Sequence, residues 1–308
     1  MKQSISLVLS VVAYVAYANQ TLGKDIDYVN RGVARAKVGD KAGALADYSK
    51  AILLDPRDPI AFIDRAILRF DSGDRKGAFD DINHALEFNQ IDSNALCARA
   101  GFKAENQDLN GALVDYTEAL KWNKKDSLAY TGRGIVRREL SDTIAALADF
   151  EKAIVLDSGN LLARFNHLCL IIDKKRARAE YEKLIKLNAS DSEDHLTLAN
   201  AHYHFGYLDK ALDELSKAIE LNKAYAHAYY NRAVIRQEKG DKTGSLSDYN
   251  KAIEIDSTNP RVYYNRSLLR ESMNDREGAM KDLNRALEIN PHLKTRENRA
   301  KPFELMLS

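Results

Sequence analysis

The sequence predicts an all-α protein built from stacked helical hairpins. Three observations support this fold class: an alanine recurs every 34 residues, small side chains occupy fixed places within each interval, and a turn signal lies near its middle. The recurring alanines are Ala51, Ala85, Ala119, Ala153, Ala218, Ala252 and Ala286. The 65-residue gap between the fourth and the fifth divides into intervals of 34 and 31 residues, with Leu184 in the missing alanine's place. A fixed period of this length is typical of solenoid proteins.

The period divides residues 25–293 into eight repeats, of which the fifth is degenerate. Their predicted bounds are 25–58, 59–92, 93–126, 127–160, 161–191, 192–225, 226–259 and 260–293. Residues 1–18 and 19–24 precede them as a predicted signal peptide and a short leader, and residues 294–308 follow as a tail. We expect the tail to cap the last repeat or to bind a partner. We also expect the shortened fifth repeat to separate repeats one to four from repeats six to eight.

Each repeat is expected to form two antiparallel helices, here called helix A and helix B. Positions 8, 20 and 27 of the repeat hold Ala, Gly or Ser in most units, and small side chains at this spacing let two helices approach closely. The turn between the helices is marked by Gly39-Asp40, Gly73-Asp74 and Gly240-Asp241. Glycine adopts the left-handed conformation that ends a helix, and aspartate can cap the helix that follows.

Further recurring residues give the repeat a resemblance to a known family. Position 24 is aromatic in Tyr48, Tyr116, Phe150 and Tyr249, and position 32 is proline in Pro56 and Pro291. With the small residues, this pattern resembles the tetratricopeptide repeat over 269 of the 308 residues. The resemblance implies a right-handed superhelical solenoid whose concave groove binds a protein or peptide partner. Positions 7 and 11 depart from the family pattern, because they hold arginine in place of leucine and tyrosine.

Those arginines recur together with an aspartate at position 23. Six repeats hold all three charges, with lysine once at position 11, whereas repeats five and six have His167 and Leu198 at position 7 and a glutamate at position 23. An arginine on helix A that pairs with a carboxylate on helix B can hold the register of the hairpin. We therefore interpret these charges as structural struts; the alternative is a basic row that recognises acidic groups of a ligand.

Repeats six to eight supply the candidate peptide-binding residues. The family places helix-A positions 2, 5, 6, 9, 12 and 13 in the groove, and the resemblance implies that these residues bind a peptide: Asn200, Tyr203, Tyr230, Asn231, Arg261, Tyr264 and Asn265. Asparagine can bond both polar groups of an extended backbone, and tyrosine gives contact area at low entropy cost. The carboxylate clamp of the chaperone-adaptor members matches at only three of five positions. The alternative is that asparagine at position 6 belongs to the scaffold.

The N-terminus has the layout of an export signal. Lys2 precedes an apolar run from Ile5 to Val15, and Ala16-Tyr17-Ala18 follows with small residues at both positions that a signal peptidase reads. The apolar stretch of 14 residues is shorter than the roughly 17 that a membrane-spanning helix needs. The sequence therefore predicts a periplasmic or secreted protein; the alternative is an uncleaved start on a cytoplasmic one.

Composition and motifs argue against nucleic-acid binding, membrane spanning and catalysis. The chain has 46 Lys and Arg against 45 Asp and Glu, a formal charge of +1, so it offers no basic field to a phosphate backbone. We predict no catalytic residue, no metal ligand set and no cofactor. Two alternatives remain: a self-assembling solenoid, and a metal-assisted enzyme that uses His195, His202 and His227. The sequence favours a non-enzymatic adaptor for a protein or peptide partner.

Overall fold

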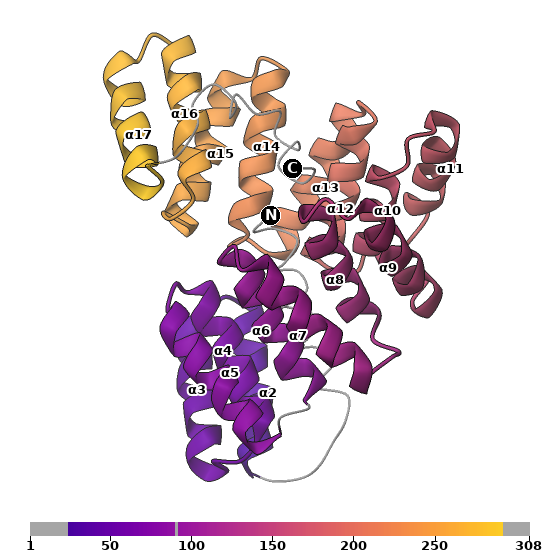
Figure 1. Ribbon diagram of the computed structural model, residues 1–308. Coiled ribbons are helices and arrows are strands. Elements are labelled where there is room, and N and C mark those ends of the chain that lie inside the picture. The colour runs from indigo at the N-terminus through magenta and orange to yellow at the C-terminus, as the bar shows by residue number, and fades with distance from the viewer. Residues whose placement is uncertain (1–23, 90–91, 292–308) are drawn as a thin grey trace. The chain divides into compact units, whose positions relative to one another are not determined.

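The computed structural model describes residues 24–89 and 92–291, and the predicted signal peptide (1–18), leader residues 19–23 and the tail (294–308) lie outside them. Within the described residues the chain forms sixteen helices and no strand (Figure 1). The helices are α2 (Lys24–Lys37), α3 (Lys41–Leu54), α4 (Pro59–Asp71), α5 (Arg75–Phe88), α6 (Ser93–Glu105), α7 (Leu109–Trp122), α8 (Ser127–Glu139), α9 (Thr143–Leu156), α10 (Leu161–Cys169), α11 (Lys174–Leu184), α12 (Ser192–His204), α13 (Leu208–Leu221), α14 (Ala226–Glu238), α15 (Lys242–Ile255), α16 (Pro260–Ser272) and α17 (Arg276–Ile289).

Consecutive helices pair as hairpins, which confirms the predicted fold class. Seven pairs pack as hairpins: α2 on α3, α4 on α5, α6 on α7, α8 on α9, α12 on α13, α14 on α15 and α16 on α17. Within the compact units, helix B of one hairpin also packs on helix A of the next, as α3 does on α4 and α13 on α14. The predicted caps are present: Asp40 precedes α3 and its Oδ1 accepts a hydrogen bond from the backbone N–H of Gly43 at 2.9 Å. Gly39 before it has a φ of 84°, the left-handed conformation expected at a helix end.

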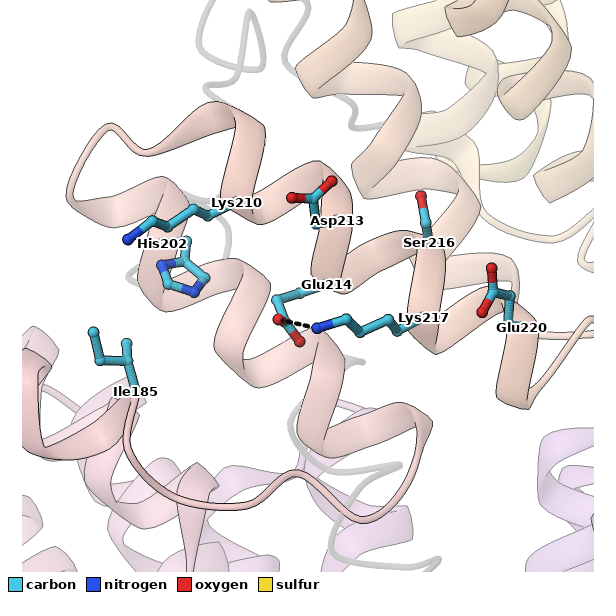
Figure 2. Close-up of a pocket in the computed structure, with 8 residues that line it drawn as sticks. All are labelled: Ile185, His202, Lys210, Asp213, Glu214, Ser216, Lys217 and Glu220. Carbon is cyan, nitrogen blue, oxygen red and sulfur yellow. Dashed lines mark hydrogen bonds and ion pairs between the residues drawn. The ribbon is translucent and has the colours of Figure 1, made fainter.

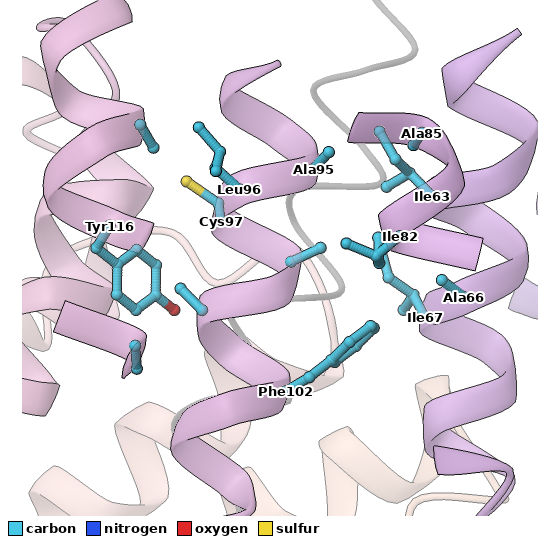
Figure 3. Packing of buried hydrophobic residues seen from close by; sticks show 14 of the residues in the cluster. Ile63, Ala66, Ile67, Ile82, Ala85, Ala95, Leu96, Cys97, Phe102 and Tyr116 are labelled. Carbon is cyan, nitrogen blue, oxygen red and sulfur yellow. The ribbon is translucent and has the colours of Figure 1, made fainter. Parts of the chain in front are cut away.

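The small residues of helix A make room for the aromatic ring of helix B. A Cβ added to Gly134 would lie 2.6 Å from Cε1 of Phe150, and one added to Gly132 would lie 2.5 Å from Cζ of Tyr116. Alanines, Ile63, Phe102 and Tyr116 form one buried cluster through repeats two to four (Figure 3). The ring of Phe102 stacks on Phe70 with 4.3 Å between centroids, so neighbouring helices A share apolar contacts.

The chain divides into two compact units, Met1–Ala177 and Arg178–Ser308, at a point inside the fifth repeat. The boundary falls within the shortened repeat, which the sequence predicts to separate repeats one to four from repeats six to eight. α10 has nine residues where the other helices A have 13 or 14. The segment 170–173 that follows has no helical structure, and the Ile172 side chain in it is 97% exposed. Among the residues described, no helix is long and apolar enough to cross a membrane.

Candidate functional site

The predicted struts are present in six repeats, where each joins helix A to helix B of the same hairpin. In repeat four, Arg133 donates from Nε and NH2 to the two carboxylate oxygens of Asp149 at 2.9 and 2.8 Å, and Arg137 donates to Oδ2 at 2.7 Å. The aspartate is buried while the guanidinium groups reach the surface. Equivalent pairs are Arg31–Asp47, Arg65–Asp81, Arg99–Asp115, Arg232–Asp248 and Arg266–Asp282. The interpretation of these charges as structural is confirmed.

Four of these arginines also reach the preceding repeat. The remaining N–H of Arg65 donates to the hydroxyl of Ser49 at 3.1 Å, and that of Arg266 donates to Oδ1 of Asn250 at 2.7 Å. Arg99 with Asn83 and Arg232 with Ser216 repeat this contact. A guanidinium fixed by its own aspartate therefore also links adjacent hairpins.

Repeat six replaces the strut with a histidine and a longer carboxylate. Glu214 lies at the aspartate position, and its Oε2 is 2.5 Å from Nδ1 of His195, while Lys217 donates to Oε1 at 2.8 Å. Hydrogen bonds from Lys217 and His195 lower the pKa of Glu214 against the opposing effect of burial. A hollow of about 580 Å³ lies beside this pair, lined by charged residues of α13 and by Ile185 (Figure 2). Three carboxylates and two lysines alternate along its wall, so it offers no continuous patch of one charge.

The histidines of repeats six and seven are not gathered around a metal site. His195 is held by Glu214, and Nδ1 of His202 lies 2.9 Å from the hydroxyl of Tyr181 on α11. Burial lowers the pKa of His202. Within the part of the chain that the structure describes, no three His, Cys, Asp or Glu side chains are placed to hold a metal ion. The geometry gives no support to the metal-assisted alternative.

The seven predicted peptide-binding residues, here called the inner-face residues, lie on α12, α14 and α16. Tyr203 and Arg261 are partly buried. The other five, namely Asn200, Tyr230, Asn231, Tyr264 and Asn265, are at most 7% exposed. Residues that line a groove are expected to be exposed, and for Asn231 and Asn265 this expectation is wrong. The cause is packing between repeats, because the three helices bring these side chains against one another.

Polar side chains on adjacent helices pair across the inner face. Asn265 donates from Nδ2 to the hydroxyl of Tyr230 at 2.8 Å, and Asn231 donates from Nδ2 to Oδ1 of Asn200 at 3.4 Å. Burial raises the pKa of Tyr230 to about 12, so the phenol stays protonated. The carbonyl oxygen of Asn231 is buried and accepts no hydrogen bond within the described residues. The inner-face residues therefore include one unsatisfied acceptor, which is the kind of group a peptide N–H can satisfy.

Sequence reasoning missed Asp64, which lies at the position of Asn231 and Asn265 in repeat two. Its carboxylate is 3% exposed, and neither oxygen has a hydrogen-bond partner within the described residues. Burial raises its pKa to about 8. In the register of the repeat, the residues that face position 6 in repeats seven and eight correspond to Val29 and Val33, which cannot donate. The available signal was an aspartate at position 6 of helix A, directly after Ile63, where repeats seven and eight hold asparagine.

Comparisons with known proteins agree with this architecture. A family model described as tetratricopeptide repeat matches residues 226–259 and 260–293. No curated protein matches the chain. Among solved structures, the Cut9 and Hcn1 hetero-tetramer of the APC/C matches with a TM-score of 0.60 and 12% identity, over 91% of this chain and 55% of the other.

Two further structures show the same fold. IFIT1 in a monomeric mutant form with Gppp-AAAA matches with a TM-score of 0.60 and 12% identity, over 92% of this chain and 74% of the other. PilF of Pseudomonas aeruginosa matches with a TM-score of 0.50 and 19% identity, over 65% of this chain and 92% of the other. The chain spans about half the length of the first structure, with 55% of it covered. At these identities the likeness establishes the fold alone.

Proposed function

We propose that this tetratricopeptide repeat protein is a non-enzymatic scaffold that binds an extended peptide segment of a partner protein along its inner-face residues. Stacked hairpins of this kind commonly present an extended concave surface for binding. One of the similar structures is itself part of a hetero-tetramer of two protein types. From the layout of residues 1–18 we also propose that the protein is exported.

The unsatisfied carbonyl of Asn231 is the observation that carries the proposal. A buried acceptor without a donor is costly, and the backbone N–H of an extended peptide supplies the donor it lacks. The neighbouring amides of Asn200 and Asn265 already hold the side chains of the inner-face residues in fixed orientations. Because this acceptor is buried, a peptide that bonds Asn231 must first displace the side chains that cover it.

Two partly buried inner-face residues, Tyr203 and Arg261, offer the peptide accessible side chains to contact. Tyr203 on α12 donates from its hydroxyl to Oε2 of Glu238 on α14 at 3.0 Å, at an exposed edge. Arg261 on α16 is partly exposed and can pair with an acidic side chain of the partner. Tyrosine and arginine are the side chains most enriched at the energetic centres of interfaces.

Partner capture tests the proposal. The full chain and its Asn231→Ala variant would be immobilised and exposed to extract from the host, and the retained proteins identified by mass spectrometry. We then expect the variant to bind the purified partner about 1–3 kcal/mol more weakly in calorimetry, the cost of losing one desolvated bond. Arg261→Glu should weaken binding of an acidic partner further.

Matched variants separate binding from folding. Asn284 and Arg276 lie exposed on α17, so Asn284→Ala and Arg276→Glu repeat the same chemical changes away from the inner face. Full affinity in both, together with loss in the inner-face variants, supports the proposal. Equal affinity in all four variants would place the binding surface elsewhere. Light scattering that shows only a larger assembly of the chain with itself would favour the self-assembling alternative.

A further inference from the structure

A second hollow lies on the unit that ends at Ala177, beside the shortened fifth repeat. Its volume is about 860 Å³. Its walls come from helix B of repeat four and from the end of α10 through the start of α11: Leu147, Glu151, His167, Leu170, Ile171, Ile172, Asp173, Lys174, Lys175 and Arg176. In a full-length repeat, helix A continues over this stretch; here α10 stops at Cys169 and leaves the hollow open.

The lining has an apolar part that the fold leaves uncovered. Leu147, Leu170 and Ile171 are partly buried, while the Ile172 side chain is 97% exposed. A single exposed isoleucine is ordinary on a protein surface. At the rim of a hollow that already holds three apolar side chains, it extends a concave apolar surface, which is the usual floor of a binding site.

The charged part of the lining is basic in effect. Oε1 of Glu151 lies 3.7 Å from Nε2 of His167, and Oδ1 of Asp173 accepts a hydrogen bond from the backbone N–H of Arg176 at 2.7 Å. Both carboxylates have a partner within the fold but keep their charge, so the three cations of the lining outnumber them by one. Lys174, Lys175 and Arg176 are exposed, and the described residues give their side chains no ion pair.

These three cations lie at the N-terminus of their helix. They form the first turn of α11, which holds no acidic residue. Positive charge at a helix N-terminus is unfavourable because the backbone N–H groups already make that end positive. Three cations at this place therefore destabilise the helix. They also add to the positive potential of the helix N-terminus beside the apolar hollow.

We propose that this hollow docks an acidic peptide segment that places a bulky apolar side chain against Ile172 and carboxylates against Lys174, Lys175 and Arg176. The site lies on the opposite unit from the inner-face residues, so it is independent of the function proposed above. A peptide accounts for both parts of the lining. A nucleic-acid backbone would use the cations alone and normally needs a more extended basic surface.

Fluorescence anisotropy on the full chain tests this site. The probe is a labelled synthetic peptide, Gly-Glu-Asp-Leu-Phe-Glu-Asp-Gly. We expect Ile172→Ser to raise its Kd by about tenfold, and Lys174→Glu with Lys175→Glu to raise it by at least about tenfold. The affinity of the wild type should fall with added salt, because rim charges are screened.

Controls keep the outcome clear. Ile144→Ser makes the same substitution at another exposed isoleucine, and Lys124→Glu with Lys125→Glu makes the same charge change, both on the same unit and outside the hollow. These variants should bind as the wild type does. The charge reversal at 174 and 175 favours the start of α11, so circular dichroism should show intact helix.

Two results would overturn the proposal. One is a probe affinity that is the same in the Ile172 variant, the charge-reversed variant and the controls. The other is displacement of the probe by a uridine oligonucleotide whose own binding is unchanged by Ile172→Ser, which would assign the cations to nucleic acid. The Asn231→Ala variant should bind this probe normally, so failure of one site is distinguishable from failure of the other.

Discussion

Replacing Asp64 by asparagine should make the protein more stable at neutral pH and remove part of its pH dependence. The carboxyl is buried without a partner, and burial raises its pKa to about 8, whereas an aspartate in an unfolded chain titrates near 3.9. The folded state therefore holds a proton that the unfolded state releases. Between these two pKa values, raising the pH favours the unfolded state, because only the unfolded state releases the proton. The free energy of unfolding is therefore highest at low pH and falls as the pH rises toward 8.

The magnitude follows from the width of that window. One pH unit corresponds to about 1.4 kcal/mol, so about four units correspond to roughly 6 kcal/mol in total. The asparagine amide is buried at the same place and carries its own cost of about 1–3 kcal/mol at every pH. The variant should therefore be close to the wild type at about pH 5 and more stable at about pH 8, and the difference should grow by about 4 kcal/mol across that interval.

Urea unfolding followed by tryptophan fluorescence measures this difference. Trp122 is the single tryptophan of the chain, and it lies in the same compact unit as Asp64, so its signal reports that unit. Asp80→Asn, on the exposed side of α5, removes one carboxylate without touching the interior and serves as the matched control. A difference between the Asp64 variant and the wild type that stays constant from pH 5 to pH 8 would refute the reasoning.

Three further predictions concern the hairpins and the N-terminus. Asp149→Asn leaves the partly buried Arg133 without its counter-charge and should lower the free energy of unfolding by roughly 3–5 kcal/mol in urea titration; a loss below 1 kcal/mol would contradict a structural strut. Gly132→Ala should destabilise by about 1–3 kcal/mol despite the gain in helix propensity, because its Cβ would meet the Tyr116 ring; a raised melting temperature would show that the ring can move. N-terminal sequencing of the expressed protein should begin at or near Asn19, and an intact Met1 would support the cytoplasmic alternative.

The sequence predicts the hairpins and struts well because both depend on residues inside one repeat. Arg133 and Asp149 are 16 residues apart, and the same separation recurs in six repeats, so their pairing follows from the period. The exposure of the inner-face residues does not follow from it. Asn265 is buried because Tyr230 of the preceding repeat accepts its hydrogen bond, and such a contact depends on which residue the neighbour happens to hold.

The departures in individual repeats were hard to predict for the same reason. Neither oxygen of Asp64 has a hydrogen-bond partner within the described residues, and the places that hold Asn200 and Tyr230 in later repeats hold valine in repeat one. Glu214 reaches His195 because its side chain is one methylene longer than the aspartate it replaces. Loss of the arginine in repeat six was visible in the sequence, but its substitute came from position 4, where no other repeat has a histidine.

The arginine that joins neighbouring hairpins has a consequence for how such a chain can change its length. In four repeats its fork is anchored by an aspartate of the same repeat, and its Nη1 group meets a serine or an asparagine at position 25 of the repeat before. Both halves of the junction are thus encoded at fixed positions of one 34-residue cassette. A cassette that is duplicated or excised in register brings a matching junction with it, so the gene can gain or lose whole repeats without new compensating substitutions at the seam. Repeats five and six, which lack the arginine, are where such an exchange would leave a mismatched joint.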